Sequence, residues 1–468
     1  MQNKKEYKLW GSAFKDAPDS LMIQFTVGHD VYAIPPADEA LIPYDIQCNI
    51  AQVKMLGFQK IISQAEMKKL LEALKKLTKI YQNGEFKLDP ALEDVHTNIE
   101  NWVAKNYGSE LAGKIHTGRS RNDQVVTDMY LYLHDNINKY IESIGLLVDT
   151  LAVSSKKYKN TICPGFTHHQ HATVTSFGLI LDSFKVAFER DITSFKDLKS
   201  KFNYSPLGAC VGYGSLMNIN PEYSAKELGF VDGSIFKNPI DVISNRGEFE
   251  AGLAFQITQF INHASNLAET LILFSTTEFG FVKLADQYST GSSAMPQKKN
   301  PDPLELIKGI AAVSSGILNS LLQITNGNLI GYNRDSQETK YLIYHLIIKS
   351  QPIPLILKGI IETLNVFPQT MKAQANKGFI NSMGLMELIM TKYKIPMREA
   401  KVLIEKSIKH SIEAGEKDKV QYNAFKKAVK EMDLEIDLKE AEFISWQDGE
   451  FQYSVIPGKS VIPTKVEI

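Results

Sequence analysis

A polar stretch from Gly291 to Asp302, GSSAMPQKKNPD, contains the residue types that could bind an anion. Its glycine and two prolines keep it out of regular structure, so we expect a loop. The apolar residues that follow, beginning with Leu304 and Ile307, predict a buried helix directly behind this loop. Backbone N–H groups at a helix start and two lysines favour a carboxylate or phosphate, although each lysine alone also fits a solvated surface loop.

A second polar cluster, HTGRSRNDQ, spans His116–Gln124. It precedes an apolar stripe that predicts a helix, so Arg121 and Asn122 would stand at a helix N-terminus, close to Arg119. Exposed arginines are usually only solvated. At a helix start, however, planar guanidinium groups suit the recognition of carboxylates.

A third cluster, PGFTHHQHATVTSFG, contains His168, His169 and His171. Imidazole is a common zinc ligand, but no cysteine or carboxylate lies nearby and adjacent histidines rarely face one centre. We therefore expect no metal site here. A general acid or base among these histidines is the stronger interpretation, and a purely structural role for each remains open.

Two further segments carry weaker signals. In GYNRDSQETK, Gln337 and Lys340 are three residues apart on a predicted helix and could share a face with Tyr332. The glycine-rich SPLGACVGYGS, residues 205–215, lacks the GxGxxG pattern between a strand and a helix, which excludes a dinucleotide site there.

Long helices must position these clusters. Four stretches lack proline, at residues 91–163, 165–205, 240–295 and 304–351. Within the third, apolar residues recur every three or four positions from Phe249 to Phe274, which predicts a helix of about seven turns. Ser63 with Glu66 predicts a capping box before another amphipathic helix. The sequence therefore predicts an all-α protein with a central bundle of long helices.

Composition narrows the class of protein. The chain has 468 residues, with 52 basic and 53 acidic side chains and a formal charge of −1, so no general affinity for nucleic acid or an anionic membrane is expected. The three cysteines are far apart and form no CxxC pattern. The N-terminus lacks the apolar stretch of a signal peptide. These features predict a cytoplasmic protein in a reducing compartment.

Taken together, the segments resemble the fumarase/aspartase superfamily and, within it, the argininosuccinate lyases. The resemblance spans about residue 9 to about residue 410. The matching motifs appear in the family's order, as LWGSAF, DVHTNIE, HTGRSRNDQ, PGFTHHQ, SPLGACVGYGS, TGSSAMPQKKNPDPLELI and GYNRDSQETK. The loop pattern GSSxMPxKxNP is typical of the superfamily. HTGRSRNDQ and the continuation QKKNPD are typical of the argininosuccinate branch.

The resemblance implies a three-domain all-α fold, which we divide at residues 1–112, 113–363 and 364–468. It also implies a homotetramer in which each active site draws on three chains. The family reaction is the reversible cleavage of argininosuccinate to arginine and fumarate, with neither a metal nor an organic cofactor. It serves arginine biosynthesis.

The resemblance also assigns roles to residues of this sequence. Ser292 would be the base, Lys298 and Asn300 would stabilise the carboxylate beside the reacting carbon, and His168, tuned by Glu305, would handle the proton on the departing nitrogen. Substrate binding would use two groups: Arg121, Asn122 and Thr167; and Tyr332, Gln337 and Lys340, which hold the amino-acid end.

Several positions depart from the family pattern. Ala13 stands where arginine is common, Gly28 matches a usual serine, residues 34–38 look inserted, and Cys48 and Asn49 replace the glycine and serine of DIQGS. These departures leave room for a sister lyase that joins a different amine to fumarate. A non-catalytic structural protein on the same scaffold is a third hypothesis, although it would not require the catalytic set.

Overall fold

The computed structural model describes residue 16, residues 19–27 and residues 34–448. The positions of Ala13 and Gly28 therefore lie outside the described residues. The α-helices are α1 Ser20–Val27, α2 Ala37–Phe58, α3 Gln64–Gln82, α4 Val95–Tyr107, α5 Ser109–Gly113, α6 Arg121–Lys157, α7 Phe177–Lys201, α8 Pro221–Glu227, α9 Pro239–Ser244, α10 Glu248–Ser275, α11 Asp302–Ile324, α12 Gln337–Ser350, α13 Ile353–Thr363, α14 Pro368–Gln374, α15 Ser382–Tyr393, α16 Met397–Glu413, α17 Tyr422–Glu431 and α18 Glu440–Asp448.

The remaining elements are short. The 3₁₀ turns are η3 Pro90–Leu92, η4 Lys114–His116, η5 Val231–Gly233, η6 Asp286–Tyr288 and η7 Arg334–Ser336. The strands are β1 Ile162–Thr167, β2 Gln170–Ser176, β3 Val282–Lys283, β4 Thr290–Gly291, β5 Lys299–Asn300 and β6 Asn365–Val366. They form three two-stranded antiparallel pairs, β1–β2, β3–β6 and β4–β5. The predicted all-α class is confirmed, because the strands only connect helices.

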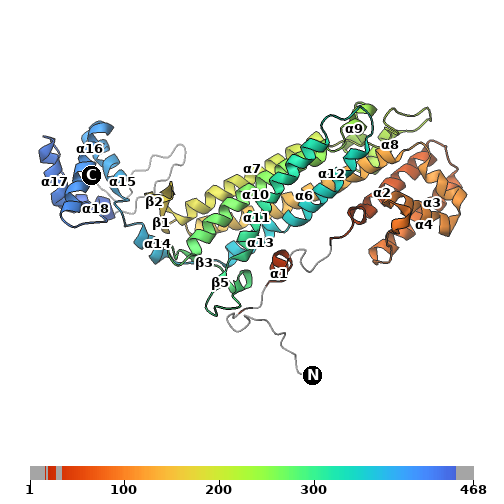
Figure 1. The fold of residues 1–468 in the computed structure, drawn as a ribbon. Helices are drawn as coiled ribbons and strands as arrows, with labels where there is room; N and C mark the ends of the chain where they lie inside the picture. Colours follow the sequence, from red (N-terminus) through yellow and green to blue (C-terminus); the bar gives the residue numbers. More distant parts are fainter. Residues whose placement is uncertain (1–15, 17–18, 28–33, 449–468) are drawn as a thin grey trace, which may run out of the picture.

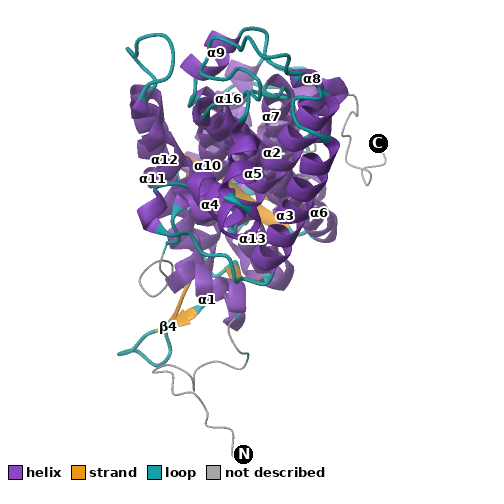
Figure 2. Ribbon diagram, turned by 90° about the vertical axis from the view of Figure 1, so that its right-hand side faces the viewer, coloured by secondary structure: helices purple, strands orange, loops and turns teal. Residues whose placement is uncertain are grey.

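The long helices run lengthwise through the molecule (Figure 1). At one end lie α2, α3 and α4, and at the other lie β1, β2 and α14 to α18. In the view turned by 90° about the vertical axis, the helices form one bundle, and β4 lies at its lower end, far from α8 and α9 (Figure 2). The ends of the long helices therefore hold the connecting loops far apart.

Local sequence signals explain where these helices begin. Ser63 accepts a hydrogen bond from the N–H of Glu66 in the capping box that the sequence predicts. Ser120 and Asp123 form a second capping box that starts α6 at Arg121. The predicted apolar stripe after Phe249 lies on α10, where its members are buried. Each of these features depends on a few neighbouring residues, which is why sequence alone could anticipate it.

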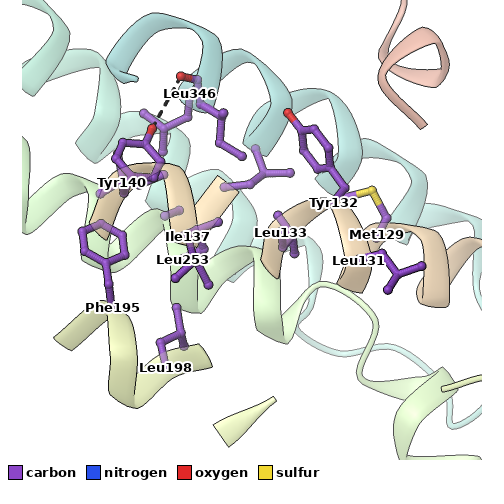
Figure 3. Packing of buried hydrophobic residues seen from close by; sticks show 14 of the residues in the cluster. Met129, Leu131, Tyr132, Leu133, Ile137, Tyr140, Phe195, Leu198, Leu253 and Leu346 are labelled. Atoms are coloured by element: carbon purple, nitrogen blue, oxygen red, sulfur yellow. Dashed lines mark hydrogen bonds between the residues drawn. The ribbon is translucent and has the colours of Figure 1, made fainter. Parts of the chain in front are cut away.

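The main core forms where α6, α7, α10 and α12 meet. In Figure 3, Tyr140 lies beside Phe195, and Leu253 and Leu346 approach from the other helices. The rings of Tyr140 and Phe195 are stacked, with centroids 5.3 Å apart. This core includes residues from Met22 to Met371, whereas α15 to α18 surround a smaller one that runs from Leu385 to Trp446. The three-domain division stays a prediction.

One helix leaves an apolar face uncovered. By length and composition α11 is the one candidate membrane span among the described residues, yet only 22% of its most apolar window is buried in the protomer. Leu304 and Ile307 are buried, as predicted, but Val313 and Leu322 are each 52% exposed. The prediction of a buried helix therefore holds for one face of α11 within a single chain.

Candidate active site

The N-terminal ends of α4, α6 and α12 lie together at one end of the bundle. Arg121, the first residue of α6, pairs through Nη1 with Asp94 Oδ2 at 3.2 Å, and its Nη2 donates to Thr97 Oγ1 at 2.8 Å. The next residue, Asn122, donates to the carbonyl oxygen of Val211 at 3.3 Å. The helix starts contribute partial positive charge, so this region suits an anion.

The neighbouring His116 lies in the same positively charged environment. His116 lies in a small cleft with Arg119 and Arg121 among its lining residues. Burial, followed by these two arginines, lowers the pKa of His116 to about 4. The imidazole is therefore neutral at physiological pH, and the charge of this cleft comes from the arginines.

Tyr332, Gln337 and Lys340 lie around the start of α12, beside the same region. The Tyr332 ring is 39% exposed and lies near the buried guanidinium of Arg246, 5.9 Å from its centre. Gln337 accepts from Arg334 Nε at 3.2 Å. Lys340 forms an ion pair with Asp38 of α2, whose second oxygen accepts the backbone N–H of α4. The structure thus brings Lys340 to the same cluster of helix starts as Arg121.

The two predicted residues of the histidine segment lie elsewhere. Thr167 ends β1, and His168 with His169 forms the two-residue turn of the β1–β2 hairpin. Both histidines have positive φ, 52° and 58°, as the turn type that matches hairpin twist requires. Because both are exposed, His168 presents its imidazole to solvent at the hairpin tip.

The loop around Ser292 forms a third, separate group. Its base is the β4–β5 pair, in which Thr290 faces Asn300. Ser292 Oγ accepts hydrogen bonds from the backbone N–H groups of Ala294 at 3.3 Å and Met295 at 3.0 Å. Lys298 is exposed in the loop, and Glu305 is exposed on the first turn of α11. The predicted loop directly before a helix is confirmed.

Helix lengths show how far apart these groups are. Arg121 begins α6, and the hairpin that carries His168 follows its end, so about 55 Å of helix separates them at 1.5 Å per residue. Ser292 precedes α11 and Tyr332 follows it, with about 35 Å of helix between them. One chain therefore gathers Arg121, Asn122, Gln337, Lys340 and Tyr332 but does not bring Ser292 or His168 to them.

Sequence reasoning missed a buried polar network next to the Arg121 group. His96 Nδ1 lies 2.9 Å from Asp45 Oδ1 and 3.6 Å from Asp128 Oδ2, and Gln124 donates to Asp45. Arg119 Nη2 donates to Asn49 Oδ1 at 2.6 Å, and Asn49 donates in turn to Asp45. Asn49, which departs from the family pattern, is therefore part of this buried hydrogen-bond network. The sequence did contain a signal for this network, since the charged Asp45 falls among the apolar residues of its helix.

The network has the donor types of a cation site, but its charges are balanced internally. The ligand atoms of Asp45, His96 and Asp128 lie within 4.8 Å of one another, and all three residues are buried. Burial opposes ionisation of Asp45, but His96 and then Arg119 lower its pKa. Burial and then Asp45 raise the pKa of Asp128 far above its usual range, so Asp128 retains a proton that Asp45 accepts.

This assignment predicts opposite outcomes for two similar substitutions. Asp45→Asn should destabilise the fold by about 3–5 kcal/mol, because it removes the buried carboxylate that accepts from Gln124 and Asn49 and that offsets the charge of the buried Arg119. Asp128→Asn should cost less than about 1 kcal/mol, because the amide N–H replaces the acid O–H toward Asp45. Thermal unfolding followed by circular dichroism would measure both.

The pH dependence gives a second readout. The folded chain retains a proton on Asp128 that the unfolded chain loses, so this residue lowers stability as pH rises above the ordinary aspartate value. The Tm of Asp128→Asn relative to the unsubstituted protein should therefore increase from pH 5 to pH 8. Equal destabilisation by Asp45→Asn and Asp128→Asn at both pH values would instead indicate a bound cation.

The sequence and the fold both resemble those of known proteins. A family model described as lyase matches residues 14–316. The argininosuccinate lyase of Geobacillus thermodenitrificans (strain NG80-2) is 37% identical over 408 residues, which cover 87% of this chain and 86% of that protein. The argininosuccinate lyase of Campylobacter jejuni (strain RM1221) is 34% identical over 397 residues, which cover 85% and 84%.

Solved structures agree on the fold. EDDS lyase in complex with formate matches with a TM-score of 0.80 at 24% identity, covering 93% of this chain and 85% of that one. The β-carboxy-cis,cis-muconate cycloisomerase of Acinetobacter calcoaceticus sp. ADP1 matches with a TM-score of 0.71 at 15% identity, covering 94% and 95%. At these identities the likeness concerns the fold alone. The sequence matches, in contrast, extend over most of both chains, and the chain therefore belongs to the argininosuccinate lyase branch of the fumarase/aspartase superfamily.

Proposed function

We propose that this protein is an argininosuccinate lyase that reversibly cleaves argininosuccinate to arginine and fumarate in arginine biosynthesis. The observation that carries the proposal is the cluster of helix starts that gathers Arg121 and Asn122 with Lys340 and Gln337. Two cationic side chains beside helix N-termini suit a substrate with several carboxylates. The full-length similarity to argininosuccinate lyases supports the same substrate.

The proposed chemistry begins at the carbon beside a carboxylate of the succinyl group. Ser292 Oγ accepts the proton from this carbon, and Lys298 and Asn300 stabilise the negative charge that develops on the carboxylate. Two backbone N–H groups already point at Ser292 Oγ, which supports a serine that must carry negative charge. The C–N bond then breaks to release fumarate, while His168, tuned by Glu305, gives a proton to the departing nitrogen of arginine.

The remaining proposed residues bind the substrate. Arg121, Asn122 and Thr167 contact it, and Tyr332, Gln337 and Lys340 hold the amino-acid end of arginine. Because Thr167 and His168 lie about 55 Å of helix away from Arg121 within one chain, this scheme requires parts from other chains.

We propose that those parts come from a homotetramer with shared active sites. The uncovered face of α11 supports this assembly, since Gly309, Ala312 and Gly316 are exposed and small, and a Cβ added at either glycine meets nothing within 4 Å. No charged side chain occurs between Lys308 and Arg334. Such a face allows helices to pack closely, and burying it against other subunits would stabilise them.

We further propose a cytoplasmic location. Its support is that Cys48, Cys163 and Cys210, the three cysteines of the sequence, are all buried and unpaired. Buried free thiols are usual where the environment is reducing.

The activity can be tested directly. Purified protein mixed with argininosuccinate should produce ultraviolet absorbance of fumarate together with arginine, which chromatography would identify. A second candidate is a sister lyase with another amine, which the substitution of Ala13 and the inserted residues 34–38 favour. If argininosuccinate is not cleaved, fumarate plus a panel of amines distinguishes that candidate from a structural role without catalysis.

A further inference from the structure

The strands β4 and β5 form the base of the loop that carries Ser292. They make only two residue pairs, of which Gly291 with Lys299 lies nearer the loop tip. Ser292 directly follows Gly291, and Lys298 directly precedes Lys299. This one pair therefore sets how far the proposed base lies from the lysine proposed to stabilise the substrate carboxylate. Because an isolated two-stranded hairpin is marginally stable at best in water, further contacts must hold such a short base.

Two aspartates outside the loop supply those contacts. On β4, Thr290 Oγ1 donates a hydrogen bond to Asp302 Oδ2. On β5, Lys299 Nζ forms an ion pair with Asp286 Oδ1. Asp286 begins η6, which precedes the loop, and Asp302 begins α11, which follows it. Each strand is therefore tied through a side chain to an element outside the loop.

The ion pair on β5 is partly shielded from water. The side chains of Lys299 and Asp286 are 24% and 13% exposed. Fully exposed ion pairs contribute little because water screens both charges, whereas shielding strengthens the attraction between them. We therefore expect these two side chains to stay together when substrate binds.

The two adjacent lysines of the loop consequently differ in what their charges meet. Lys298 is exposed, whereas the charge of Lys299 is offset by Asp286. Successive side chains of extended backbone also point to opposite faces. One lysine is thus left for the substrate, and the other holds the loop.

We infer that Asp286 and Asp302 are positioning residues of the proposed active site. Through their partners on β5 and β4, they hold the two ends of the Ser292 loop at a fixed separation. This inference rests on the proposed function and adds two residues that act without touching the substrate. The proposed base and Lys298 must reach one carbon and its carboxylate together, and a misplacement of about 1 Å can cost about 100-fold in rate.

A double-mutant cycle on argininosuccinate cleavage tests the ion pair. Asp286→Ala and Lys299→Met should each lower kcat by ~10- to 100-fold and change KM by less than ~3-fold, because they disturb the geometry of proton transfer and no substrate contact. The double variant should lose no more than either single one, since its second change removes an interaction that is already lost. Lys299→Arg should retain kcat within ~5-fold, because a guanidinium can still pair with a carboxylate.

Two outcomes of the cycle would contradict the inference. Losses that multiply in the double variant would mean that Lys299 acts independently of Asp286. A higher KM with unchanged kcat in Lys299→Met would mean that this lysine binds the substrate directly.

The hydrogen bond on β4 is tested by a pair of variants at one position. Thr290→Val keeps the shape of the side chain but removes the donor to Asp302, so kcat should fall by ~3- to 10-fold. Thr290→Ser keeps the hydroxyl group and should retain kcat within ~2-fold. Equal kcat in the valine and serine variants would remove Asp302 from the inference.

Amide hydrogen exchange measures the two anchors without turnover. Peptides from residues 286–304 should exchange faster in Asp286→Ala and Thr290→Val, because the β4–β5 pair opens more often, while the other peptides report whether the fold is retained. Lys392→Met is the matched control, since it breaks an ion pair with Glu442 between α15 and α18. It should change neither kcat nor exchange of the loop by more than ~2-fold.

Exchange and cleavage together separate this inference from the proposed function. Cleavage by the unsubstituted protein, with unchanged exchange and unchanged kcat in Asp286→Ala, would overturn the inference alone. Faster exchange of the loop in the variants of a protein that does not cleave argininosuccinate would overturn the proposed activity and support the two anchors. Neither cleavage nor a change in exchange would overturn both.

Discussion

Ser292→Ala is expected to lower kcat for argininosuccinate cleavage by about 10²- to 10⁴-fold, the usual contribution of a positioned general base. The serine oxygen is the proposed proton acceptor, and methyl cannot replace it. Rates of fumarate formation at saturating substrate would measure the effect. The fold should not change, because the Ser292 side chain, among the residues that the structure describes, bonds to backbone groups of its own loop.

The adjacent Ser293 provides the control for this experiment. Ser293 is exposed in the same loop, so Ser293→Ala should retain kcat within about 3-fold. Equal losses in the two variants would indicate that the loop needs polarity in general and that Ser292 is not the base. Unchanged kcat in Ser292→Ala, with the expected Tm, would assign the proton transfer to another residue.

Mixing two inactive variants is expected to restore activity. If Ser292 and Lys340 reach one site from different chains, subunits of Ser292→Ala and Lys340→Met can combine their intact halves. Random assembly at a 1:1 ratio would leave about one quarter of the sites intact, because each site draws each of the two residues from a different subunit. The variants would be mixed, dissociated, reassembled and assayed for fumarate release.

A mixture with both lesions in one loop is the matched control. Subunits of Ser292→Ala and Lys298→Met change the same segment, so no reassembled site would receive an intact loop, and activity should stay at the level of the separate variants. Failure of the Ser292→Ala and Lys340→Met mixture to exceed its parents, with tetramers reassembled, would show that each chain completes its own site. That outcome would conflict with the helix lengths that separate Ser292 from Tyr332.

The sequence by itself determined the elements and the matching motifs. The capping residues Ser63 and Ser120, the apolar stripe along α10 and the polar loop before α11 depend on side chains within a few turns of each other. Such local preferences act before any tertiary contact forms, so they can be predicted from spacing. The resemblance to a lyase family followed from the order of the motifs, and the comparisons confirm it.

Only the tertiary structure decided which of these motifs meet. Arg121 and Lys340 are far apart in sequence, yet packing of α2 against α4, α6 and α12 brings them to one end of the bundle. Asp45, His96 and Asp128 form a buried network for the same reason, since each comes from a different helix. Conversely, His168 and Ser292, which the family pattern places in one site, lie beyond the far ends of long rigid helices. Side-chain spacing along a chain describes one helix face, whereas distances between faces depend on helix length and packing, and those belong to the folded molecule.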